Sequence, residues 1–424
     1  MRFKNIMCCV CGAVCDDIEV EISEKEIKVY NACKLGEAKF HELRSKDRIT
    51  KPLMDGKEAK WDKALKKSAE ILKNAKHPLL FIGSETSTET VSAGIEIAEY
   101  LGGVIDSHPT VCHGPTVMGI QEAGLPTATL GEVKNRADLI IYWGANPMES
   151  HLRHLSRYAI FPRGYFREEG MKERTIVVID PRKTPTTELA DLHVRIEPNK
   201  DYELMSAIGA ILNGHDITKA VGGVDTDTIY KLTEMMKNCK FGVIFIGLGL
   251  ASSVGKYRNL EKAMKLVRNI NKFTRFILIP NLGHGNVSGF LQAMTWQSGF
   301  PFGVDYSRSY PRYNPGEFTT VDLLKNREVD AMLIVAAGLA GSLPRDVVEF
   351  MSEIPVISVD ISPCPTTLLS DVVLPGVIMG MESDGTIYRM DHVPLGLRKF
   401  TKPPFDFTKS DEDTLRQLFE KIKR

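Results

Sequence analysis

The sequence predicts an α/β fold with doubly wound, mostly parallel sheets in two or more Rossmann-like domains. Apolar runs of strand length alternate with helical patterns along most of the 424 residues. Such alternation is typical of parallel sheets, because each crossover must carry the chain back along the sheet. The expected strands are Leu79–Gly83, Asp138–Gly144, Thr175–Asp180, Phe241–Gly247, Arg275–Pro280, Asp330–Gly338 and Pro355–Asp360.

Two segments show helical periodicity. Trp61–Ala75 carries apolar residues at spacings of three and four, which predicts an amphipathic helix. A last helix is expected after Ser410, whose hydroxyl can cap the amino end. Its apolar stripe comprises Leu415, Leu418, Phe419 and Ile422.

Composition narrows the class of protein. The 54 basic and 54 acidic residues balance, so no net field directs the chain to nucleic acid or anionic lipid. No stretch reaches the ~18 apolar residues of a membrane span, and no apolar signal core follows Met1. We therefore expect a cytoplasmic protein with small-molecule or protein partners and no membrane span.

Several expected strands run directly into glycine, as at Gly83, Gly144 and Gly247, the last of which is followed by Gly249. Ligands of open α/β sheets bind beyond the carboxyl ends of the strands, where glycine lets backbone N–H groups approach a diphosphate. Tight turns also use glycine. The repeated pattern nevertheless indicates an extended or paired nucleotide-like cofactor.

Four early cysteines have the spacing of a metal site: Cys8, Cys11, Cys15 and Cys33. Both structural zinc and iron–sulfur clusters use four thiolates. Three cysteines at spacings x2 and x3 with a distant fourth favour a [4Fe–4S] cluster, with zinc or unligated thiols as alternatives. Cys9 falls outside the spacing and is interpreted as a spare thiol, and Cys239 and Cys364 as buried structural thiols.

A second constellation is Cys112-His113-Gly114-Pro115, followed by a helical pattern. A helix amino terminus or a neighbouring imidazolium favours the thiolate of a cysteine. Cys112 could therefore be a nucleophile, a metal ligand or a packed core residue. His151 and His154 are interpreted as part of a polar helix near anionic cofactor tails.

These motifs, followed by Tyr142–His151, Asp180–Lys183 and Ser370–Pro375, occur in the order seen in molybdopterin oxidoreductases of the formate dehydrogenase type. The resemblance covers nearly the whole chain. The short cysteine motif and the segment Tyr310–Glu317 are most similar to the catalytic B subunits of archaeal formylmethanofuran dehydrogenases.

The resemblance implies a bis(molybdopterin guanine dinucleotide) cofactor with tungsten or molybdenum, ligated by Cys112, with His113 handling protons or polarising the substrate. It implies cluster ligation by the four early cysteines. It also implies that a [4Fe–4S] domain spans 1–55, that 56–110 with 275–424 binds one pterin dinucleotide, and that 111–274 binds the other. The pterin contacts it implies are Gly83, Gly144, Asn146, Asp180, Arg182 and Gly249.

The activity implied is reversible reduction of CO2 to formate, which an amidohydrolase A subunit then condenses with methanofuran in methanogenesis. Other implied partners are a D subunit, a C subunit and ferredoxin-like polyferredoxin subunits. The chain ends about 50 residues after Pro375, which leaves too little length for a C-terminal β-barrel domain. We expect the D subunit to supply that domain.

Two positions depart from the formate dehydrogenase pattern. Leu282 occupies the place of an active-site arginine that would orient a carboxylate, unless His284, Arg308 or Arg312 compensates. Lys34 lies one residue before the position of the relay lysine. The alternatives are therefore a formate dehydrogenase-like paralogue with another substrate, or a non-catalytic electron-carrying or assembly subunit.

Overall fold

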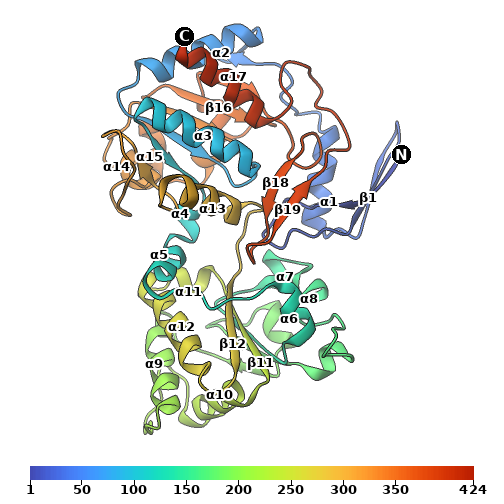
Figure 1. Ribbon diagram of the computed structural model, residues 1–424, viewed down its shortest axis with the longest axis vertical. Coiled ribbons are helices and arrows are strands. Elements are labelled where there is room, and N and C mark those ends of the chain that lie inside the picture. Colours follow the sequence, from blue (N-terminus) through green and yellow to red (C-terminus); the bar gives the residue numbers. More distant parts are fainter. The chain divides into compact units, whose positions relative to one another are not determined.

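The computed structural model describes residues 1–424 and divides into two compact units (Figure 1). Unit 1 comprises Met1–Val111, His284–Arg389 and Pro394–Arg424. Unit 2 comprises Cys112–Gly283 and Met390–Val393. The expected boundary at residue 275 is wrong, because β12 (Arg275–Pro280) pairs in parallel with β11 (Phe241–Ile246) along its whole length and so belongs to unit 2.

Unit 1 is built on a nine-stranded sheet with the order β14-β13-β7-β6-β15-β16-β17-β4-β5. The five strands from β7 to β17 in that order are parallel, and the short outer strands are antiparallel. Their bounds are β4 Leu53–Met54, β5 Lys57–Glu58, β6 Pro78–Ile82, β7 Val104–Asp106, β13 Val304–Asp305, β14 Arg312–Tyr313, β15 Ala331–Val335, β16 Val356–Asp360 and β17 Val372–Pro375.

The chain leaves β6 toward β7 but runs from β15 to β16 and β17 in the other direction. The strand order therefore reverses between β6 and β15. Such a switch point is where open α/β sheets bind ligands, at the carboxyl ends of the strands.

Helices cover the sheet of unit 1. Helix α17 (Asp411–Lys423) packs on α2 (Trp61–Asn74) and α3 (Thr88–Leu101), and these lie side by side in Figure 1. Ser410 caps α17 as predicted, since its Oγ accepts a hydrogen bond from Asp413 N at 3.0 Å. The remaining helices are α1 Lys34–His41, α4 Pro109–Cys112, which ends at the first residue of unit 2, α13 Val287–Ser298, α14 Thr320–Lys325, α15 Arg345–Met351 and α16 Pro365–Leu369.

Two small antiparallel sheets complete unit 1. The strands β1 (Arg2–Ile6), β2 (Ile18–Ile22) and β3 (Ile27–Tyr30) form a three-stranded sheet, and β18 (Gly385–Tyr388) pairs with β19 (Pro394–Leu397). The first sheet packs through buried aliphatic side chains such as Ile18 and Val20. It holds the loop that carries Cys8, Cys11 and Cys15.

Unit 2 contains a five-stranded, fully parallel sheet with the order β10-β9-β8-β11-β12. The order in which the chain adds strands to this sheet reverses between β8 (Leu139–Trp143) and β11. Continuous aliphatic runs are buried on both faces, as expected for a parallel sheet with helices on either side. Its other elements are β9 Thr175–Ile179, β10 Leu192–Val194, α5 Gly114–Ala123, α6 Leu130–Arg136, α7 Pro147–Ser150, α8 His154–Arg157, α9 Asp201–Leu212, α10 Thr226–Asn238, α11 Leu248–Ser252 and α12 Tyr257–Ile270.

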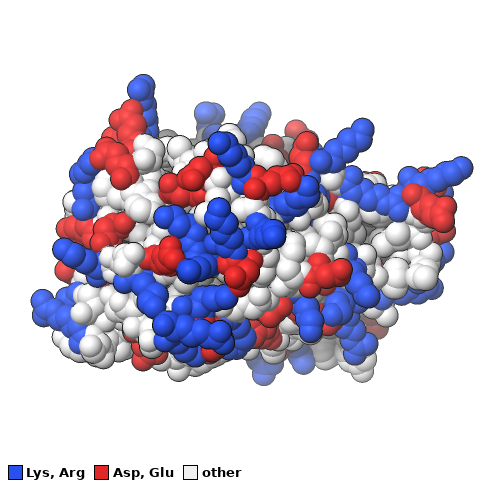
Figure 2. Space-filling model, turned by 90° about the horizontal axis from the view of Figure 1, so that it is seen from above, with Lys and Arg blue, Asp and Glu red and all other residues white.

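All seven expected strands are present as β6, β8, β9, β11, β12, β15 and β16, which confirms the predicted α/β class with parallel sheets. None of the helices combines the length and the apolar character of a membrane span. Lys and Arg side chains lie among Asp and Glu side chains on the face shown in Figure 2, in keeping with the balanced charge.

Candidate functional site

At the switch point of unit 1, the loop after β6 touches the loop after β15. Gly83 N donates to Val335 O at 2.7 Å, and a Cβ on Gly83 would lie 2.1 Å from Ala336 O. Ala336 itself has a positive φ of 49°, which is costly for a residue with a side chain. Close packing of the two loops therefore explains Gly83 without a ligand, and its predicted pterin contact stays a prediction.

A cavity of about 510 Å³ opens at the carboxyl ends of β6, β15, β16 and β17. Its polar lining includes Lys39, Glu85, His108, His284, Asp360 and Asp411. Cys364 also lines the cavity. Both Cys364 and Cys239 are only partly buried, so their interpretation as buried structural thiols is wrong. The cavity lies where the sheet topology predicts a ligand.

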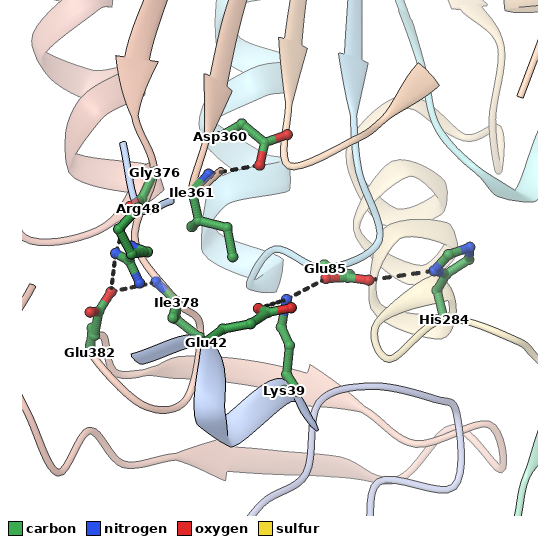
Figure 3. A network of polar contacts seen from close by, with 10 residues as sticks. All are labelled: Lys39, Glu42, Arg48, Glu85, His284, Asp360, Ile361, Gly376, Ile378 and Glu382. Carbon is green, nitrogen blue, oxygen red and sulfur yellow. Dashed lines mark hydrogen bonds and ion pairs between the residues drawn. The ribbon is translucent and has the colours of Figure 1, made fainter. Parts of the chain in front are cut away.

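A charged network lines this cavity (Figure 3). Lys39 Nζ lies 2.9 Å from Glu85 Oε2 and 2.8 Å from Glu42 Oε2, and Glu85 Oε1 lies 3.8 Å from His284 Nδ1. Burial opposes ionisation of Glu85, but His284 and Lys39 outweigh it and lower the pKa of Glu85 to about 2. Lys34, by contrast, is exposed at the start of α1. Lys39 is thus the α1 lysine that reaches the cavity.

His108 is held against His284. Ser84 N donates to His108 Nδ1 at 2.9 Å, and the two imidazole rings stack with their centroids 4.4 Å apart. Burial lowers the pKa of His108 to about 4, and the neighbouring His284 adds to this. His108 is therefore neutral at pH 7, with its proton on Nε2.

A buried ion pair supports the floor of the cavity (Figure 3). Arg48 Nη2 lies 2.9 Å from Glu382 Oε2, and their side chains are 5% and 2% exposed. The same Glu382 oxygen accepts from Ile378 N at 2.8 Å, and Arg48 donates to Gly376 O at 3.3 Å. The pair fixes the segment after β17 that lines the cavity.

The four predicted cluster cysteines lie in two segments of unit 1. Cys8 N donates to Cys15 O at 2.8 Å, which closes the first loop, and Cys33 caps α1. A Cβ on Gly36 would lie 3.0 Å from Cys8 Sγ and 3.8 Å from Cys33 Sγ, so glycine lets both thiols approach this turn.

Burial raises the pKa of Cys11, and the charges of Cys8, Cys15 and Cys33 raise it further. No three His, Cys, Asp or Glu side chains in residues 1–424 are gathered closely enough to hold a metal ion. Cluster ligation by these cysteines therefore stays a prediction. Cys9 is also buried, and its thiol lies at 3.9 Å from Met7 O.

At the switch point of unit 2, as in unit 1, a glycine lets two loops that follow neighbouring strands touch. Gly249 N donates to Gly144 O at 3.0 Å, and Gly144 has a φ of 56°. A Cβ on Gly144 would lie 2.6 Å from Leu250 N, and one on Gly247 would lie 2.3 Å from Gly144 O. These glycines let the loops after β8 and β11 meet, a role that does not require a ligand.

Asn146, Asp180 and Arg182 follow the carboxyl ends of β8 and β9. Asn146 Oδ1 accepts from Thr186 Oγ1 at 2.6 Å, and its Nδ2 donates to Glu149 at 2.6 Å. Asp180 is buried and accepts from Arg182 N at 2.8 Å, while the Arg182 side chain is 76% exposed. The structure places all three at the edge where a ligand would bind, but their contacts are internal.

Cys112 and His113 stand at the start of unit 2, directly before α5. Burial raises the pKa of the Cys112 thiol to about 11, against the effect of the backbone N–H of His113. His113 is buried, and its Nδ1 lies 3.3 Å from Thr116 Oγ1. Thr116 is a contact of His113 that the sequence analysis missed.

Leu282 is 4% exposed, and its backbone is held by a histidine. His151 Nε2 donates to Leu282 O at 2.7 Å, while His151 Nδ1 accepts from Ser150 Oγ at 2.8 Å. His154 is fully buried and its ring lies 4.5 Å from that of Phe245. The interpretation of the two histidines as part of a polar helix is wrong: His151 precedes α8, and both rings pack inside unit 2.

Asn281, beside Leu282, was not singled out from the sequence. It is 5% exposed, and both polar atoms of its amide are buried without a partner. A buried amide without hydrogen bonds is costly, so a polar ligand or water at this edge would be stabilised by it. In the sequence, the one sign of a role for Asn281 in the site is its position directly after the expected strand Arg275–Pro280.

Arg312 is not free to take the role of the arginine that the resemblance implies at position 282. Its guanidinium pairs with the buried carboxylate of Asp305 and lies 4.7 Å above the ring of Phe318. It therefore joins β14 to β13. Arg308 is exposed, so His284 is the one of the three candidates that lines the cavity.

The family model of the molybdopterin oxidoreductases matches residues 48–421. The chain belongs to the molybdopterin oxidoreductase family. It is 44% identical to the B subunit of tungsten-containing formylmethanofuran dehydrogenase 2 from Methanocaldococcus jannaschii, over 99% of this chain and 98% of the relative. The relative of the same name from Methanococcus maripaludis is 42% identical over the same shares. The predicted resemblance is confirmed.

Two solved structures have a fold similar to that of this chain. The formyltransferase/hydrolase complex FhcABCD from Methylorubrum extorquens contains a chain with a TM-score of 0.71 at 19% identity, covering 88% of this chain and 98% of that one. Acetylene hydratase from Pelobacter acetylenicus has a TM-score of 0.73 at 16% identity, covering 99% and 69%. At these identities the likeness supports the fold.

Proposed function

We propose that the chain is the cytoplasmic redox subunit of a formylmethanofuran dehydrogenase, which interconverts carbon dioxide and formate at a tungsten or molybdenum centre. The observation that carries the proposal is 44% identity, over nearly the full length, to a relative named as the B subunit of a tungsten-containing formylmethanofuran dehydrogenase. The presence of Cys112 and of the four early cysteines supports the proposal, because a scaffold without turnover has no need of them.

The residues present fit a metal-bearing pterin cofactor. Cys112 offers a soft thiolate for a sulfur-rich metal, and a bound cation would favour its deprotonation. In unit 2, the unpartnered amide of Asn281 would gain hydrogen bonds from a polar ligand. Gly83, Gly144, Asn146, Asp180, Arg182 and Gly249 would hold the diphosphates and guanines, with one pterin dinucleotide on each unit.

When bound, the centre would supply the two-electron chemistry. His113 would give or take the proton that accompanies it; because Nδ1 pairs with Thr116 Oγ1, Nε2 is the atom for this transfer. Cys8, Cys11, Cys15 and Cys33 would hold a [4Fe–4S] cluster that exchanges electrons with polyferredoxin subunits. An A subunit would condense formate with methanofuran, and the C and D subunits would complete the assembly.

Leu282 favours a second candidate, a paralogue that acts on another substrate. A leucine cannot orient a carboxylate, and Arg312 is committed to Asp305. The two candidates differ in their substrate and not in their cofactor.

The complex, purified anaerobically through a tag on this chain, should contain tungsten or molybdenum, pterin and iron. It should reduce carbon dioxide with a low-potential donor, and more strongly when methanofuran is present. Metal and pterin without carbon dioxide reduction would support the paralogue. Absence of tungsten, molybdenum and pterin would contradict both.

Cys112→Ser should lower activity by more than 100-fold and reduce the content of tungsten or molybdenum, while the iron content stays the same. Cys239→Ser is the matched control, since Cys239 is a partly buried thiol of unit 2 that contacts Met236 O at 3.2 Å. Unchanged activity of Cys112→Ser would refute its assignment as the metal ligand.

A further inference from the structure

An aromatic loop stands out on the surface of unit 2. Residues 161–171, between α8 and β9, expose four large apolar side chains within eleven positions. The exposed fractions are 44% for Phe161, 78% for Tyr165, 49% for Phe166 and 38% for Met171. Single exposed apolar residues need no explanation, but a group of aromatic residues marks an interaction site.

The backbone of this loop is held rigidly. The buried guanidinium of Arg174 donates to the carbonyl oxygens of Lys134, Ala137, Ile160 and Pro162 at 2.7 to 3.3 Å. Gly164 N donates to Arg167 O at 2.9 Å, and the N–H groups of Tyr165 and Phe166 donate to Asn135. The aromatic side chains are therefore presented by an ordered scaffold, which reduces the entropy lost on binding.

The rings flank a cavity of about 570 Å³ that is lined by Arg136, Tyr165, Phe166, Lys240 and Arg275. The Arg136 guanidinium lies 4.7 Å above the Phe166 ring. Lys240 and Arg275 are exposed. Lys240 directly precedes β11, and Arg275 is the first residue of β12, so the cavity lies at the edge of the sheet where the strands begin. The glycine loops lie at the other edge, on the order of 16 Å away along a five-residue strand.

The charges at this cavity favour an acidic partner. Arg136, Lys240 and Arg275 have no carboxylate in ion-pair contact, whereas Arg167 pairs with Asp138 at 3.4 Å and Glu169 with Lys172 at 3.6 Å. Glu168 and Glu173 lie at the same rim, so the unpaired cations outnumber these two acids. Tyr, Phe, Met and Arg are also the residues enriched in protein interfaces.

We infer that the aromatic loop and its cationic cavity form a docking surface for another subunit of the assembly, which inserts an apolar side chain flanked by Asp or Glu. This inference rests on the multisubunit assembly of the proposed function. It does not depend on the cofactor, because the surface lies at the opposite edge of the sheet of unit 2. The partner's carboxylates would meet Arg136, Lys240 and Arg275.

The test uses the intact complex, purified through a tag on this chain. The double variant Tyr165→Ala/Phe166→Ala should lower the stoichiometry of one co-purified subunit at least tenfold, and Lys240→Glu/Arg275→Glu should do so most strongly at low salt. Tyr202→Ala, which removes an exposed tyrosine of α9 in the same unit, is the matched control. Retention of every subunit at full stoichiometry in both double variants would overturn the inference.

A photo-cross-linking residue at position 165 of the otherwise unchanged chain identifies the occupant. A cross-link to an acidic segment of a stoichiometric subunit supports the inference. A cross-link to a second copy of this chain, or none at all, overturns it. Metal and pterin contents are measured on the same preparations. A cross-link to an acidic segment of a subunit, in a complex that lacks metal and pterin, would refute the proposed function but support the docking surface. Metal and pterin without such a cross-link would support the proposed function but refute the docking surface.

Discussion

The imidazole of His151 is hydrogen-bonded to the backbone of Leu282: Nε2 donates to the carbonyl oxygen at 2.7 Å. Leu282 stands where the resemblance to the formate dehydrogenase type implies an arginine. Ser150 Oγ donates to the other ring nitrogen, so the ring is neutral and its tautomer is fixed. Burial lowers the pKa of His151, which keeps this arrangement in place. The bond fixes the path of the backbone at Leu282.

Replacement of His151 by alanine should lower the free energy of unfolding by about 2 kcal/mol, because it leaves the Leu282 carbonyl unpaired and creates a cavity. His151→Gln should lose less, since its amide can still donate. Denaturant unfolding of both variants measures the difference. His215→Ala removes an exposed histidine of the same unit and should change stability by under about 0.5 kcal/mol. Equal losses in His151→Ala and His215→Ala would contradict the role of the bond.

Restoring an arginine at Leu282 separates the two candidate functions. If carboxylate chemistry operates at this site, Leu282→Arg should lower the KM for formate by about tenfold, since a charge-assisted hydrogen bond contributes about 1.5–3 kcal/mol. Leu282→Met keeps the volume without the charge and should leave KM unchanged. Steady-state kinetics of formate oxidation provide the measurement. An unchanged KM in Leu282→Arg would favour a substrate that is not a carboxylate.

The buried pair Arg48–Glu382 should be far more sensitive than an exposed one. Glu382→Gln leaves a buried guanidinium without its counter-charge, so we expect a loss of about 3–5 kcal/mol in the free energy of unfolding. The control is Glu353→Gln, which breaks the exposed pair with Arg327 (52% and 55% exposed) and should cost under about 1 kcal/mol. Similar losses in the two variants would show that the cavity floor does not depend on the pair.

The contact between His77 and Asp305 should make stability depend on pH. His77 Nε2 lies 3.1 Å from Asp305 Oδ1, and this hydrogen bond raises the pKa of His77 against the effect of burial. Burial opposes ionisation of Asp305, but hydrogen bonds from His77, Ser307 and Arg312 lower its pKa to about 2. The raised pKa means that His77 stabilises the folded state fully below its unfolded pKa of about 6.5. This contribution to the free energy of unfolding is lost as pH rises through the higher pKa of the folded state.

Asp305 has the opposite pH dependence. Its contribution to the free energy of unfolding is present above about pH 4 and is lost as pH falls toward 2. His77→Gln should therefore destabilise unit 1 by about 1 kcal/mol at pH 5.5 and by less at pH 8.5. Unfolding of wild type and variant at the two pH values tests this. His41→Gln, at an exposed histidine 3.9 Å from Glu37, is the control. A loss that is equal at both pH values would contradict the charged contact.

The sheet strands were predictable because they are buried on both faces. β8 is a continuous run of aliphatic and aromatic residues, and β11 is one except for Gly242; the two strands are followed by Gly144 and Gly247. The two-residue strands β13 and β14 were not predicted, since their pairing depends on the contact between Asp305 and Arg312 and not on a local pattern. The boundary error at residue 275 has a similar cause: an apolar strand carries no sign of which sheet it will join.

At the candidate site, sequence motifs located Cys112, His113 and the glycine loops, but not the internal partners of these residues. The contacts of His151 with Leu282 and of Lys39 with Glu85 join segments 131 and 46 residues apart. Only folding brings such residues together. His154 was misinterpreted because a histidine beside two arginines suggests solvent, whereas its ring is packed against Phe245.

The connectivity of the two units sets an order of events during synthesis. Apart from residues 390–393, unit 2 is one continuous insert between Val111 and His284, so its sheet can form as soon as β12 has emerged. β6 and β7 must wait for β15, which begins 225 residues after β7 ends. At roughly 5–20 residues per second this delay is on the order of 10–45 s. During that time the edge of β6 that will pair with β15 stays open to aggregation, so newly made chains should depend on a chaperone, and the cavity of unit 1 can receive a ligand only late in translation.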